Sequence, residues 1–109
     1  MRERNVEQNL VEFLTKTLDD LKAQDILAID VKGKSSITDT MILATGTSSR
    51  HVASTAERLI TEAKQAGFEV FGDEGKAVAD WIVVDFGKAM VHLLQSDSRE
   101  MYQLEKLWA

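Results

Sequence analysis

Apolar positions in two stretches of the chain recur every three or four residues, which is the spacing of amphipathic helices. The first stretch predicts a helix over residues 4–22. The second begins at Ser48 or Ser49, either of which can cap a helix, and stops at Gly67. Each predicted helix has one apolar side, so each needs another layer to cover it.

Other apolar runs have the composition of strands. DILAIDV and ITDTMILAT flank the turn-prone KGKSS and predict a hairpin of two largely buried strands. FEVF predicts a short strand, and two further runs meet at Gly87-Lys88 in a second hairpin. With Ser96 as its N-cap, the segment DSREMYQLEKLW predicts a last short helix.

This order of elements predicts the fold class. Helix, two strands, helix, short strand, two strands and helix are typical of a two-layer α/β domain with a mixed five-stranded sheet. We expect the helices mainly on one face of the sheet, which leaves the other face partly open. With 109 residues, the chain is expected to form a single domain over residues 1–109.

The second hairpin divides its residues into two sets. Counting outward from the Gly87-Lys88 turn puts an apolar set on one face: Ile82, Val84, Phe86, Ala89, Val91 and Leu93. The other face carries Trp81, Val83, Asp85, Met90, His92 and Leu94. A tryptophan among aliphatic and polar neighbours is typical of a protein interface, although the final helix could equally well cover it. The count leaves both interpretations open.

The C-terminal segment is unusually apolar for a chain end. Its last nine residues contain Met101, Tyr102, Leu104, Leu107 and Trp108, whereas chain ends are usually polar and frayed. Either the protein's own sheet or a partner must bury these side chains.

Composition narrows the classes of partner. Thirteen Lys and Arg against eighteen Asp and Glu give a net charge of −5, which disfavours direct nucleic-acid binding and suits a basic protein partner. The chain has no cysteine, no apolar signal region and no apolar run of the roughly 18 to 20 residues that span a bilayer. We therefore expect a cytoplasmic protein that does not enter a membrane.

Catalytic chemistry has little support in the sequence. The segment ATGTSSRH runs from a strand into a helix start and could hold an anion, but glycine and serine are also common there for turning and capping. Asp80 and Asp85 fall on opposite faces of a strand, which argues against a two-metal site. His51 and His92 lack metal-ligand spacing. We expect no catalytic residue, no metal and no cofactor, and hence no enzyme.

Four segments together resemble a known family. DILAIDV, SSITDTMILATGTSSRHV, DWIVVDFGKAMVHLL and SREMYQLEKLW are similar, in order and spacing, to the ribosomal silencing factor family, also called Iojap-like. The resemblance implies a nucleotidyltransferase-like fold without the catalytic carboxylates. It also implies a translational repressor that binds a ribosomal protein on the intersubunit face of the large ribosomal subunit. By occlusion, such a repressor blocks joining of the small subunit and dampens translation under nutrient limitation.

The resemblance also implies the binding residues. Family contacts carry over onto Trp81, Tyr102, Leu104 and Glu105, and we add the neighbouring Met90, His92, Leu107 and Trp108. Lys88 departs from the acidic residue that many relatives have, so that turn is assigned no role.

The expected partner is thus the large subunit, bound through a basic ribosomal protein with little direct RNA contact. A homodimer is possible when the protein is free, because a twofold partner would cover the open face. The resemblance favours an exposed Trp81. The alternative function is a nucleotide-binding or nucleotidyl-transferring enzyme that uses the TGTSSRH loop.

Overall fold

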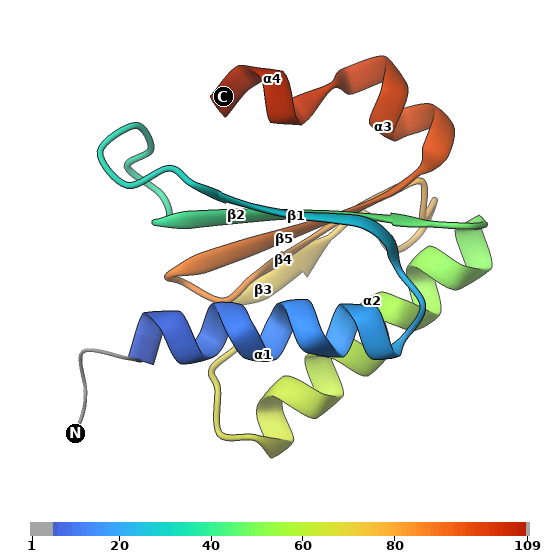
Figure 1. Cartoon of the computed structure of the whole chain (residues 1–109). Coiled ribbons are helices and arrows are strands. Elements are labelled where there is room, and N and C mark those ends of the chain that lie inside the picture. The colour runs from blue at the N-terminus through green and yellow to red at the C-terminus, as the bar shows by residue number, and fades with distance from the viewer. Residues whose placement is uncertain (1–5, 109) are drawn as a thin grey trace.

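A five-stranded sheet runs through the middle of the computed structural model, which describes residues 6–108 (Figure 1). Its strands are in the order β1-β2-β5-β4-β3, and only β2 and β5 run parallel. The elements along the chain are α1 Val6–Asp20, β1 Gln24–Asp30, β2 Thr40–Gly46, α2 Ser49–Gln65, β3 Gly72–Glu74, β4 Trp81–Asp85, β5 Ala89–Gln95, α3 Ser96–Tyr102 and α4 Leu104–Trp108.

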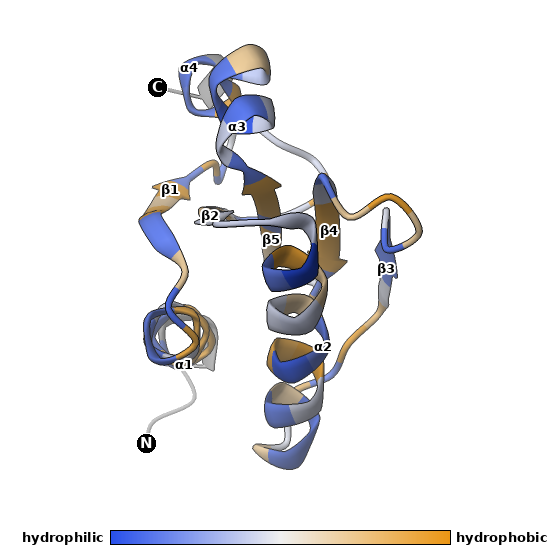
Figure 2. Cartoon of the chain, turned by 90° about the vertical axis from the view of Figure 1, so that its right-hand side faces the viewer, coloured by the Kyte–Doolittle hydropathy of each residue, from blue (hydrophilic) through white to orange (hydrophobic). Residues whose placement is uncertain are grey.

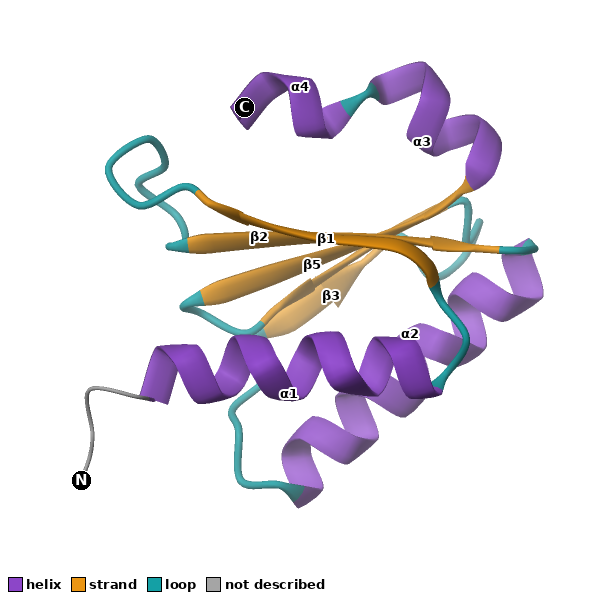
Figure 3. Ribbon diagram, viewed as in Figure 1, coloured by secondary structure: helices purple, strands orange, loops and turns teal. Residues whose placement is uncertain are grey.

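Helices lie on both sides of this sheet, but unequally (Figures 2 and 3). The long helices α1 and α2 cover one face, and the short helices α3 and α4 lie over the opposite face. The mixed sheet with helices mainly on one face is therefore confirmed, whereas the nucleotidyltransferase-like character of the fold stays a prediction. Within residues 6–108, no helix is both long and apolar enough to cross a bilayer.

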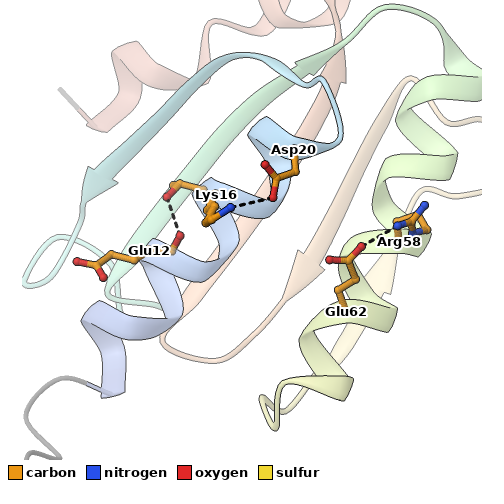
Figure 4. Close-up of polar contacts among 6 residues, drawn as sticks. Glu12, Lys16, Asp20, Arg58 and Glu62 are labelled. Carbon is orange, nitrogen blue, oxygen red and sulfur yellow. Dashed lines mark hydrogen bonds and ion pairs between the residues drawn. The ribbon is translucent and has the colours of Figure 1, made fainter.

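The main core fills the space between the sheet and the two long helices. Leu14 and Leu18 of α1 and Leu59 of α2 are fully buried there, against inward-facing residues of β2, β4 and β5. The outer sides of both helices are polar instead. Lys16 pairs with Asp20 at 3.1 Å and Arg58 pairs with Glu62 at 2.9 Å, one helical turn apart (Figure 4). Neither long helix therefore needs a further layer to cover it.

Two expectations about strands are wrong. β1 is mostly exposed, unlike the fully buried β2, because it lies at the sheet edge and pairs with β2 alone. FEVF is a connection rather than a strand, because ladder pairing with β4 starts only at Gly72. Phe68 and Val70 of this connection pack against the core instead, which accounts for their apolar character.

The C-terminal helix also differs from its prediction. Gln103 adopts a left-handed conformation with φ 48° and ψ 50°, which breaks the expected single helix into α3 and α4. Gln95, not Ser96, occupies the N-cap position of α3, and its side chain makes no capping bond. By contrast, Ser48 caps α2 as predicted, because its hydroxyl accepts a hydrogen bond from the His51 backbone N–H at 3.0 Å.

The backbone at Gly75 passes close to the first residue of β4, Trp81. Gly75 has φ +97°, and a Cβ placed on it would collide with the carbonyl oxygen of Trp81. Gly33 has a similar φ of +86° but open space around it. We predict that Gly75→Ala lowers the free energy of unfolding by about 3 kcal/mol, against about 1 kcal/mol for Gly33→Ala, as measured by urea denaturation. Equal losses in the two variants would show that the close approach to Trp81 is not a constraint.

Candidate functional site

The β4–β5 hairpin presents a different surface to each side of the sheet. Trp81 pairs with Leu94, Val83 with His92 and Asp85 with Met90, which is the register predicted from the sequence. All six residues of the predicted apolar set are buried in the main core. Their neighbours along each strand therefore face the opposite side, which we call the second face.

A small apolar cluster lies on the second face, beneath the C-terminal helices. Its buried members are Val31, Met41, Leu43, Leu94 and Leu104, with Ile29 and Trp81 packed at its margin. Leu104 is the member that α4 contributes. Part of the C-terminal segment is thus covered by the protein's own sheet, which was one of the two possibilities open from the sequence.

Trp81 lies at the edge of this cluster and connects β5 to α3. Its indole N–H donates a hydrogen bond to Nδ1 of His92 at 3.0 Å. On its other side, the ring of Tyr102 lies 4.7 Å away between centroids, tilted by 41°. Trp81 is consequently half-buried rather than exposed, because Tyr102 covers part of it. Tyr102 itself is 47% exposed, so the aromatic pair still reaches the protein surface.

The other predicted site residues differ in accessibility. Met90 is half-buried and lies farther along the second face, and Glu105 is half-buried at 3.4 Å from Arg99. Leu104 is buried, so it supports the surface from beneath. The side chains of Leu107 and Trp108 lie outside the described residues, and only their backbone, at the end of α4, is placed.

Sequence patterns predicted no role for Arg99, which makes most of the polar side-chain contacts of α3. Its guanidinium donates hydrogen bonds to the carbonyl oxygen of Asp25 and to the hydroxyl of Thr45, each at 2.9 Å, and it also pairs with Glu105. The sequence around Arg99, SDSREMY, shows only one basic residue among polar and acidic neighbours, which gave no signal for a half-buried arginine. Met101, which precedes Tyr102 on the same helix, is 73% exposed.

Several polar groups of the TGTSSRH loop bond within the protein. His51 receives a hydrogen bond at Nδ1 from the Thr47 backbone N–H at 3.0 Å, and its Nε2 lies 2.9 Å from the Leu21 carbonyl oxygen. The Ser48 hydroxyl caps α2. These contacts give the loop a structural role in joining α1 to α2. In the described part of the chain, no three His, Asp or Glu side chains cluster as metal ligands would.

A separate groove of about 580 Å³ lies away from the aromatic pair. It is bounded by Leu10 of α1, the loop around Ile37, Phe71 and the turn at Gly87. None of the predicted site residues whose side chains are described lines this groove. The predicted residues Trp81, Met90 and His92 lie instead on the second face, where Trp81 contacts Tyr102.

Comparison with known proteins identifies the family. A family model described as "Ribosomal silencing factor during starvation" matches residues 4–109. A Haemophilus influenzae protein, "Ribosomal silencing factor RsfS", is 69% identical over 100 residues, covering 92% of this chain and 98% of that relative. The chain belongs to the ribosomal silencing factor family.

Other members of the family and its wider relatives agree in fold and sequence. A crystal structure from Chromobacterium violaceum superposes with a TM-score of 0.89 at 34% identity, covering 93% of this chain and 84% of that one. The mouse protein "Mitochondrial assembly of ribosomal large subunit protein 1" is 35% identical over 90% of this chain and 44% of its own length. The resemblance expected from the sequence is therefore confirmed.

Burial also changes the acid–base behaviour of the site. Burial lowers the pKa of His92 from its usual 6.5 to about 4, since a charged imidazole would lose water there. The neutral ring also suits its contact, because Nδ1 must be unprotonated to accept the hydrogen bond from Trp81.

This lowered pKa predicts acid sensitivity of the fold. The unfolded chain binds a proton at His92 below about pH 6.5 and the folded chain only below about pH 4, so stability falls as the pH drops between these values. We expect a loss of about 2 to 3 kcal/mol from this group. Urea unfolding at pH 7 and pH 4.5 should show a smaller difference for His92→Gln, which keeps an acceptor without titrating. The same pH dependence in both proteins would contradict the assignment.

Proposed function

We propose that this protein binds the large ribosomal subunit through the second face and thereby sterically blocks joining of the small subunit. Membership of the ribosomal silencing factor family implies a regulator of translation that associates with the ribosome. The observation that supports the second face is the Trp81–Tyr102 pair, which reaches the surface beside the exposed Met101. Under nutrient limitation, such a block would dampen translation.

The choice of the large subunit draws on the wider family. The mouse relative is named for assembly of the ribosomal large subunit, and its similarity extends over 90% of this chain. A factor that covers the intersubunit face of this particle needs no chemical step, because occupancy alone excludes the small subunit. The function is thus that of a binding protein without a cofactor.

The charges around the aromatic pair favour a basic protein as the direct contact. Among the described side chains of the two helices, Asp97 and Glu100 are exposed on α3, against one exposed cation, Lys106, on α4. Arg99 and Glu105 do not change this balance, because they are half-buried and pair with each other. An apolar centre with an acidic border is complementary to a basic ribosomal protein and is repelled by phosphate. We therefore propose little direct RNA contact.

The remaining expectations follow from this role. A factor that acts on ribosomal subunits works in the compartment that holds them, so the cytoplasmic location is part of the proposal. A homodimer of the free protein would use the same aromatic surface and would have to dissociate before binding. The enzyme alternative has less support, because Thr47, Ser48 and His51 of the TGTSSRH loop form hydrogen bonds within the protein. Calorimetric titration with nucleotide and magnesium should show no heat and no turnover.

Sedimentation with purified ribosomal particles tests the proposal itself. The protein should pellet with free large subunits, should not pellet with isolated small subunits, and should lower the yield of joined ribosomes. Stable binding to small subunits without an effect on joining would contradict it.

Substitutions of the aromatic pair test the binding surface. Trp81→Ala should lower affinity for large subunits about thirtyfold or more, because truncating a central interface tryptophan typically costs about 2 kcal/mol of binding. Because Trp81 is only half-buried, the variant should still melt cooperatively. Tyr102→Ala should weaken binding in the same direction.

Phe71→Ala provides the matched control, because Phe71 is also a surface aromatic, 62% exposed, but lines the separate groove. It should bind large subunits as the parent does. Folded Trp81→Ala protein with parental affinity, or an equal loss in Phe71→Ala, would place the contact elsewhere.

Salt dependence tests the nature of the contact. Because the protein carries a net charge of −5, its affinity should not arise mainly from release of counterions from RNA. We expect a shallow plot of log affinity against log salt concentration, with a slope corresponding to about one or two phosphate contacts. A slope equivalent to six or more such contacts would show that RNA, not protein, is the main partner.

A further inference from the structure

Arg99 connects four separate elements of the second face. From α3, its guanidinium reaches the Asp25 carbonyl of β1 and the Thr45 hydroxyl of β2, and its Nε lies 3.4 Å from both carboxylate oxygens of Glu105 on α4. Its side chain is only 13% exposed, whereas the arginine of the ion pair on α2, Arg58, is 63% exposed. Arg99 is thus held in one place, unlike a typical surface arginine.

Two unusual backbone conformations make these contacts possible. Asp25 has φ 50° and lies in an irregularity of the β1–β2 ladder between Gln24 and Leu27, where its carbonyl oxygen accepts from Arg99. Gln103 has φ 48° and directs the chain back, so that Glu105 reaches Arg99. Non-glycine residues adopt such conformations at a cost, and surrounding contacts must compensate.

The backbone of Arg99 also takes part. Its carbonyl oxygen accepts a hydrogen bond from the Gln103 N–H at 3.0 Å, which closes the last turn of α3 next to Tyr102. The same residue therefore ends α3, attaches it to the sheet edge and fixes the direction of α4. Tyr102 lies three positions along α3 from Arg99, and its ring centroid is 4.7 Å from that of Trp81.

We propose that Arg99 is the positioning residue of the partner-binding surface: it holds α3 and α4 on the sheet so that Tyr102 and Trp81 are presented as one rigid aromatic pair. This role rests on the proposed function, because it concerns the same surface. A planar guanidinium can direct several N–H donors to separate acceptors at fixed angles. A lysine ammonium is a point charge on a flexible stem and cannot reproduce that arrangement.

The first test measures the position of the helices without any ribosome. The chain has two tryptophans, so Trp108→Phe leaves Trp81 as the only indole, and this variant serves as the reference. In this background, Arg99→Ala and Arg99→Lys should each raise acrylamide quenching of Trp81 about twofold or more, because Tyr102 no longer covers it. Arg58→Ala, which removes an exposed arginine ion pair on α2, should leave quenching unchanged.

The second test measures binding to purified large subunits, with the natural Trp108. Arg99→Ala should bind about tenfold more weakly, the size expected from losing one charge-assisted hydrogen bond. Arg99→Lys should not restore affinity, and Arg58→Ala should bind as the parent does. Parental binding and quenching in Arg99→Ala, or full rescue by lysine, would overturn the proposal.

A third variant tests the proposal if Arg99→Ala does not fold. Thr45→Val removes one acceptor of Arg99 and keeps the shape of the side chain. It should raise quenching and weaken binding, both to a smaller extent than Arg99→Ala, and no change in either would overturn the proposal. If the parent itself does not pellet with large subunits, the proposed function fails. The quenching comparison then still decides whether Arg99 positions the aromatic pair.

Discussion

The turn at Gly87-Lys88 sets the register of β4 against β5, and the two faces of the sheet depend on that register. Gly87 has φ +83°, and the Asp85 carboxylate accepts its N–H at 2.8 Å. Because side chains alternate along a strand, a slip by one residue would send Ile82 and Val84 to the second face and Trp81 into the core. A Cβ at Gly87 would lie 2.8 Å from the exposed ring of Phe71, so a side chain there would also have to displace that ring.

This register gives the two faces of the sheet different roles. The face under α1 and α2 buries large aliphatic side chains completely and so contributes most of the hydrophobic stabilisation. The second face has a smaller cluster, and two short helices cover it only in part. An incompletely covered apolar surface is tolerable when a partner completes it, which agrees with an aromatic pair left at its margin.

Local sequence signals predicted the features that depend on local chemistry. Ser48 caps α2, and the Gly87-Lys88 turn gave the faces of β4 and β5, because each depends on residues close together in the chain. The exposure of β1 could not be predicted in this way, since an edge position is decided by which strands pair. Apolar FEVF resembled a strand for a similar reason: Phe68 and Val70 pack against the core, but the ladder with β4 begins only at Gly72, after the exposed Phe71.

The candidate site shows the same limit. The faces of Trp81 and His92 followed from counting, but their hydrogen bond and the covering ring of Tyr102 depend on how α3 packs. Arg99 was missed because its acceptors, Asp25 and Thr45, are distant in sequence and come together only in the folded sheet. A left-handed Gln103 has no clear signature either, since glycine or asparagine more often occupies such a position.

Site-specific photo-cross-linking tests most directly whether the second face contacts the ribosome. A photoreactive amino acid would replace Met101, which is exposed beside the aromatic pair, or Thr61, which is exposed on α2 on the opposite side. With purified large subunits, we predict cross-links from position 101 to a basic ribosomal protein and none from position 61. Cross-links from position 61 alone, or from position 101 mainly to RNA, would contradict the account.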